Sequence, residues 1–234
     1  MPQGDKKYGL SATKGMNRKE KREFIWEYYK IHIIVGVLVI FFVLYGVYVF
    51  AINPSPQVYV EMSVTDVSLD DNVSSQIASA LSEALIPQDM AKKYQVQVDN
   101  FYLDPYRDPT FNNGLAQKFS AMLVTNQIDL FVFGAASFQS YGSDGDYADL
   151  AAVLDPADLA AHGDQIVTSS FASPDSADGS GVGPVYACAL KLDGNQFFAS
   201  QGVDTDGMYL AVMNGAGSDR DRIAQAVKYI MGWD

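Results

Sequence analysis

Three aspartates, Asp144, Asp146 and Asp149, form a D-x-D-x-x-D run within a glycine-rich stretch of the chain. Clustered carboxylates on flexible loops are ligands that Ca²⁺ prefers. The run does not continue into the full ligand spacing of an EF-hand loop with its closing glutamate. Two interpretations therefore stay open, a calcium site and a set of solvated turns, and no cofactor is predicted.

Four aromatic residues are candidates for binding a ligand. We expect Phe138, Tyr141, Tyr147 and Tyr186 to lie near the carboxyl ends of strands. Open α/β sheets place their ligands at that edge. The four rings could line a pocket for a small solute, or they could pack as part of the core.

Catalytic side chains are scarce. Cys188 is the only cysteine, and His162 is the only histidine after the first 32 residues. A nucleophile and its base must lie within hydrogen-bonding distance of each other. Cys188 falls in the apolar stretch VGPVYACAL and is predicted to be buried, and nothing in the sequence places His162 beside it. The sequence therefore predicts a protein that is not an enzyme.

The stretch from Ile33 to Ile52, IIVGVLVIFFVLYGVYVFAI, has no charged side chain. As an α-helix it would be about 30 Å long, the thickness of the hydrocarbon core of a bilayer. A secretory signal peptide usually has a shorter apolar region and a small-residue cleavage site. A buried core helix is rarely apolar on every side. We therefore predict one uncleaved transmembrane helix over residues 31–52.

Charge is distributed unevenly about this stretch. Residues 1–30 carry eight Lys or Arg and four acidic residues. The chain from Asn53 onward carries eight Lys or Arg and twenty-four acidic residues. Basic residues close to a span stay in the cytoplasm. The prediction is a cytoplasmic tail (1–30), the span (31–52), a linker (53–57) and an acidic extracytoplasmic domain (58–234). Such a domain does not favour nucleic acid as a partner.

Strand and helix patterns alternate after the linker. The stretch Val58–Val64 alternates like a strand, and Ile77, Leu81 and Leu85 recur at helical spacing behind a cap at Asn72. Further strands are predicted at 94–102, 128–133, 185–192 and 208–213, and further helices behind Asp108 and Asp219. This alternation predicts a three-layer α/β domain with a mostly parallel sheet.

Three segments carry a family resemblance: FSAMLVTNQIDLFVFG (119–134), YADLAAVLD (147–155) and MYLAVMNG (208–215). Their order resembles the extracellular solute-binding proteins of bacterial ABC transporters, which have the type 2 periplasmic-binding-protein fold. Members of that family usually have two lobes with the ligand between them, and this domain has room for one. The resemblance implies a reduced, membrane-anchored relative with the fold of a single lobe, and it assigns no ligand residues.

Two functions are expected from these observations. The first is a single-pass membrane protein that serves as an interaction or accessory subunit of a membrane or bacterial cell-envelope assembly, with the bilayer and a protein as its partners. The alternative is a solute-binding module related to the substrate-binding proteins of ABC transporters, with a small solute as its ligand.

Overall fold

The computed structural model describes residues 17–52, 55–103, 106, 108–135, 137–138, 147–169, 184–215 and 219–233. The chain divides into two compact units, Met1–Ser55 and Pro56–Asp234. The division falls inside the predicted linker.

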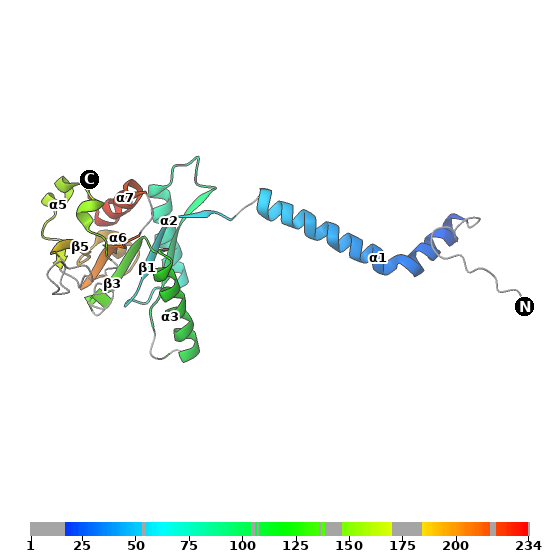
Figure 1. Ribbon diagram of the computed structural model, residues 1–234, viewed down its shortest axis with the longest axis horizontal. Helices are drawn as coiled ribbons and strands as arrows, with labels where there is room; N and C mark the ends of the chain where they lie inside the picture. The colour runs from blue at the N-terminus through cyan, green and yellow to red at the C-terminus, as the bar shows by residue number, and fades with distance from the viewer. Residues whose placement is uncertain are drawn as a thin grey trace, which may run out of the picture. The chain divides into compact units, whose positions relative to one another are not determined.

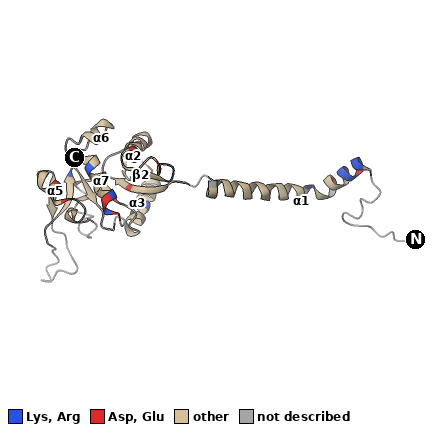
Figure 2. Cartoon of the chain, turned by 90° about the horizontal axis from the view of Figure 1, so that it is seen from above, with Lys and Arg blue, Asp and Glu red and all other residues tan. Residues whose placement is uncertain are grey.

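The first unit contains one long helix, α1 (Arg18–Val47), followed by a π-helical turn, η2 (Tyr48–Ile52). A capping box begins α1: the Asn17 side chain accepts hydrogen bonds from the backbone N–H groups of Lys19 and Glu20, and the Glu20 carboxylate accepts from the Asn17 N–H. Lys and Arg gather in its first turns (Figure 2). The stretch from residue 29 to residue 47 has a mean hydropathy of 2.4, and none of it is buried. By length and composition α1 is therefore a candidate membrane span.

The second unit is an α/β fold built on one six-stranded sheet with the strand order β2-β1-β3-β6-β5-β4. The strands are β1 (Gln57–Val64), β2 (Tyr94–Asn100), β3 (Leu130–Gly134), β4 (Ile166–Ser169), β5 (Tyr186–Lys191) and β6 (Met208–Val212). The larger helices are α2 (Asp71–Leu85), α3 (Pro109–Val124) and α7 (Arg220–Met231), and the short ones are η3 (Leu150–Ala152), α5 (Pro156–Ala161) and α6 (Gln196–Ser200). The predicted α/β class is confirmed.

The sheet is mixed, which corrects the expectation of a mostly parallel one. β1 pairs in parallel with β2 and β3, whereas β3 with β6, β6 with β5, and β5 with β4 are antiparallel. A parallel connection must carry the chain back along the whole strand. α2 and α3 are long enough to do so. Between β5 and β6 the chain forms only the five-residue α6, and these two strands pair antiparallel.

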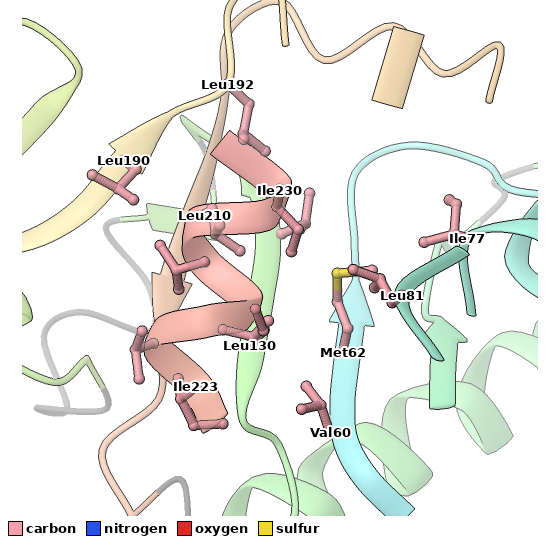
Figure 3. Close-up of a cluster of buried hydrophobic side chains, with 14 of the residues drawn as sticks. Val60, Met62, Ile77, Leu81, Leu130, Leu190, Leu192, Leu210, Ile223 and Ile230 are labelled. Carbon is pink, nitrogen blue, oxygen red and sulfur yellow. The ribbon is translucent and has the colours of Figure 1, made fainter. Parts of the chain in front are cut away.

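Helices cover both faces of the sheet and divide the core into two clusters. One face packs against α2 and α7, and Figure 3 shows Met62 of β1 beside Leu81 of α2. α3 lies on the opposite face (Figure 1). The second cluster is aromatic, with Phe119 of α3 tilted against Phe131 at 5.4 Å between ring centroids. Because neighbouring strand residues face opposite ways, β3 contributes side chains to both clusters.

Candidate functional site

The predicted metal ligands fall mostly outside the part of the chain that can be described. Asp144 and Asp146 lie outside the described residues, as does Tyr141 of the predicted aromatic set. Asp149 caps η3, and its Oδ1 accepts a hydrogen bond from the Ala151 N–H at 3.0 Å. No group of three or more His, Cys, Asp or Glu residues in the described ranges has a geometry that could hold a metal ion.

The other three predicted ligand residues lie together in the aromatic core cluster. Tyr147 is buried, and its ring stacks on Phe133 at 5.2 Å and on Phe138 at 5.8 Å. Its hydroxyl donates to the Phe138 carbonyl at 3.4 Å. The Tyr186 hydroxyl in turn donates to the Tyr147 carbonyl at 3.3 Å, and burial raises the pKa of Tyr186. The structure thus joins these rings as packing partners held by backbone hydrogen bonds.

Cys188 and His162 belong to opposite faces of the sheet. Cys188 is fully buried among the aromatic residues, donates to the Val167 carbonyl at 3.4 Å, and has a pKa raised to about 11 by burial. The His162 ring stacks on Trp233, 4.4 Å away, and Trp233 belongs to the cluster under α2 and α7. The structure therefore does not bring the cysteine and the histidine together.

A small crevice opens at the carboxyl ends of β1 and β3. α2 carries the chain from β1 to β2 over one face of the sheet, and α3 carries it from β2 back past β1 to β3 over the other face. The direction in which the strand order grows therefore changes at β1. Open α/β sheets bind ligands at such a point. The crevice has a volume of about 200 Å³, and its lining residues include Thr65, Asp66, Tyr102, Phe119 and Ser137.

Asp66 holds the two strand ends together. Its Oδ2 accepts hydrogen bonds from the Gly134 N–H at 2.9 Å and from the Thr65 hydroxyl at 3.2 Å. Its φ of +61° is a left-handed conformation that aspartate tolerates better than most residues. A Cβ at position 134 would lie 3.2 Å from the Asp66 Cβ, so a larger residue there would require Asp66 to shift by a few tenths of an ångström. The signal for this site in the sequence is a Thr-Asp pair directly after the first strand.

A larger groove runs along β2, the edge strand of the sheet. Its volume is about 640 Å³. The beginning of α2 forms one wall, α3 forms the other, and β2 forms the floor. The lining residues are Ser68, Leu69, Asp70, Asp71, Ser74, Ser75, Ala78, residues 95–102, Phe111, Leu115 and Lys118. Sequence reasoning missed this groove, because no local pattern shows that β2 is an edge strand.

The backbone of β2 has open hydrogen-bonding positions in this groove. The Phe101 N–H donates to the Val64 carbonyl beside β1, whereas the Val96 N–H points the other way and donates to Ser82 Oγ at 2.9 Å. Alternate residues of a strand direct their N–H groups to the same side. The N–H groups of Val98 and Asn100 therefore point away from β1, and neither donates to another described residue.

The two walls of the groove differ in charge. On the α2 side, Asp70 and Asp71 are exposed, and neither forms an ion pair within the described ranges. Asp70 caps α2, since its Oδ1 accepts from the Val73 N–H at 2.8 Å. The α3 side presents the half-exposed ring of Phe111, the partly buried Leu115 and Lys118, whose charge is paired with Asp99 of β2. The α2 wall is thus anionic, and the α3 wall is largely apolar.

A buried glutamate lies on β1, beneath α3 and next to this groove. Glu61 is opposite Gln97 of β2, and its side chain is almost fully buried. Burial is the main cause that raises its pKa to about 9; the charge of Asp99 and a hydrogen bond with it add to the rise, and Lys118 opposes it. Glu61 is therefore a neutral carboxylic acid near pH 7. Its Oε1 has no hydrogen-bond partner among the described residues.

The described residues thus form one candidate membrane-spanning helix and an α/β domain whose sheet is open along the β2 edge. Comparison of the chain with protein-family models, with curated proteins and with solved structures finds no match.

Proposed function

We propose that this chain is a single-pass membrane protein whose α/β domain lies outside the cytoplasm and holds a protein partner. Its role is that of a non-enzymatic interaction or accessory subunit in a membrane or cell-envelope assembly. The basic cluster at the start of α1 supports this orientation, because Lys and Arg beside a span stay on the cytoplasmic side.

The observation that carries the proposal is the groove along β2. Proteins usually protect the edge strand of a sheet with charges, proline, bulges or a covering element. Here two helices form walls beside the edge, yet leave a groove of about 640 Å³ with the Val98 and Asn100 N–H groups open to it. That volume lies within the roughly 300–1,000 Å³ of typical binding sites. A strand that has no neighbour on its outer side among the described residues, and that lies between two walls, is suited to polypeptide.

A non-enzymatic role has separate support. The single cysteine packs in the aromatic cluster under α3, and the only histidine of the α/β domain stacks on Trp233 in the other cluster. A thiol whose pKa is raised to about 11 is a poor nucleophile near pH 7.

Solute binding is the second candidate function, and the crevice at Asp66 favours it. The order β2-β1-β3, with crossover helices on opposite faces, puts this crevice where open α/β sheets bind ligands. This candidate function also rests on the resemblance to one lobe of a type 2 periplasmic binding protein, which assigns no ligand residues. The volume of this crevice, about 200 Å³, is below the usual range for a ligand site. We therefore favour protein binding at the groove over solute binding at the crevice.

Photocrosslinking with the full chain in its native cells tests the proposal. A photoreactive residue at Ser75 or at Gln95 faces the groove, and one at Thr168 on the opposite edge strand, β4, is the matched control. We expect both groove positions to form the same protein adduct and Thr168 to form none. The proposal is wrong if the groove positions give no adduct, or if Thr168 gives the same one.

A further inference from the structure

The geometry points to the kind of partner element that the groove accepts: a short extended segment that adds as a strand beside β2, with basic and apolar side chains in alternation. This inference deepens the proposed function and rests on it. It is carried by two independent features of the groove, the backbone of β2 and the different chemistry of the two walls.

The backbone of β2 limits where such a strand can pair. At the start of β2, the Tyr94 N–H donates to the Met90 carbonyl and the Val96 N–H donates to Ser82, so those donors are already used. The open donors begin at Val98 and continue at Asn100. A segment bound there pairs with the second half of β2, over about four or five residues at roughly 3.3 Å each. Main-chain hydrogen bonds supply affinity in this mode of recognition, and pockets for alternate side chains supply specificity.

The walls specify the side chains of the bound segment. Successive residues of an added strand point to opposite faces of the sheet. One set would face α2, where the Asp70 and Asp71 carboxylates are exposed and without an ion-pair partner in the described ranges. The other set would face α3, where Phe111 and Leu115 are accessible. Lys or Arg therefore fits the first set, and aliphatic or aromatic residues fit the second.

Charge argues against two other occupants. If β2 of a second copy paired edge to edge, four carboxylates of Asp70 and Asp71 would gather around one pair of strands, and like charges opposite each other destabilise a sheet. The same acidic wall repels the phosphates of nucleic acid or of anionic lipid. A basic extended polypeptide is the occupant whose charge complements the groove.

Labelled synthetic peptides test the inference with the full chain in nanodiscs of zwitterionic lipid. The first probe has about eight residues with Lys and Val in alternation, a length that covers the open part of β2. Three control peptides replace Lys with Glu, gather the same Lys and Val residues into two blocks, or methylate alternate backbone amides. Binding is measured by fluorescence anisotropy at low salt. We expect only the alternating Lys–Val peptide to bind.

Paired variants separate the groove from general electrostatics. Asp70→Asn with Asp71→Asn removes the anionic wall and keeps a side chain that caps α2 well. Asp89→Asn with Asp164→Asn makes the same change of charge at exposed positions outside the groove. We expect the first pair to weaken binding about five- to tenfold, as the loss of two partly exposed ion pairs predicts. The second pair should leave affinity within about twofold, and circular dichroism checks that both pairs fold.

The outcomes distinguish this inference from the function on which it rests. Equal binding of the Glu–Val and Lys–Val peptides, survival of binding after amide methylation, or equal losses in the two variant pairs would overturn strand addition. If Ser75 and Gln95 crosslink a protein but the alternating peptide does not bind, the interaction function stands and strand addition is wrong. If there is neither a crosslink nor peptide binding, both are wrong.

Discussion

Lys118 on α3 forms an ion pair with Asp99 on β2, with 2.6 Å between Nζ and Oδ2. The Gln97 side chain donates to the same Asp99 oxygen at 3.2 Å. This pair links the middle of α3 to the edge strand, beside the buried Glu61. It therefore connects the α3 wall of the groove with the β2 floor.

Removing the charge of Lys118 should loosen that connection. In Lys118→Met the aliphatic stem remains but Asp99 loses its partner. Because the pair is partly exposed, we expect the free energy of unfolding to fall by only about 0.2–1 kcal/mol. Urea unfolding of the full chain in detergent micelles measures the change. Lys92→Met, at an exposed position without an ion pair in the described ranges, is the control and should have no effect; equal losses in the two variants would contradict the assignment.

Glu61 should make stability depend on pH. Its folded pKa of about 9 lies above the ordinary value of 4.5, so between these two values the folded state binds more protons than the unfolded state. The contribution of Glu61 to stability is therefore fully present below about pH 4.5 and is lost as the pH rises toward 9. In Glu61→Gln, which stays neutral, this loss should disappear.

Urea unfolding at pH 5 and at pH 8 tests this expectation. Glu61→Gln should match the parent at pH 5 and exceed it by about 1–3 kcal/mol at pH 8. Glu83→Gln, on the surface of α2, is the matched control and should follow the parent at both values. A constant difference between Glu61→Gln and the parent at the two pH values would show that Glu61 is ionised in the folded protein.

Asp66 should be sensitive to substitution for two separable reasons. Asp66→Ala removes the acceptor of the Gly134 N–H and places alanine at a φ of +61°. We expect a loss of about 1–3 kcal/mol in the free energy of unfolding, from the lost hydrogen bond and the strained backbone. Asp66→Asn tolerates the left-handed conformation and keeps a side-chain acceptor, so its loss should be smaller. Equal losses in the two variants would mean that neither feature matters.

The apolar stretch of α1 should decide how the chain is retained. Arginine near the centre of a span costs about 2.5–3.5 kcal/mol on insertion scales, so Leu38→Arg together with Val43→Arg should move the chain out of the carbonate-resistant membrane fraction. Val124→Arg adds a charge at an exposed position at the end of α3 and should leave the chain in that fraction. Membrane retention of the double variant would show that α1 is not what anchors the chain.

Local patterns in the sequence were enough to predict the larger helices and most of the strands. The spacing of Ile77, Leu81 and Leu85 predicted α2, and all three residues are buried in the structure. Its cap is Asp70 rather than the predicted Asn72, since either residue can accept a hydrogen bond from the first turn. β4 was missed because it is four residues long and only partly buried, so it has no clear apolar alternation.

The sequence by itself determined the apolar span, the acidic composition of the α/β domain and the α/β class, because periodicity and charge are local properties of the chain. Only the tertiary structure decided that β2 is an edge strand, that the sheet is mixed, and that Glu61 is buried next to Asp99. Each of these depends on which segments, tens of residues apart, become neighbours. Hydrogen-bond pairing and desolvation arise from such contacts, and no window of sequence contains them.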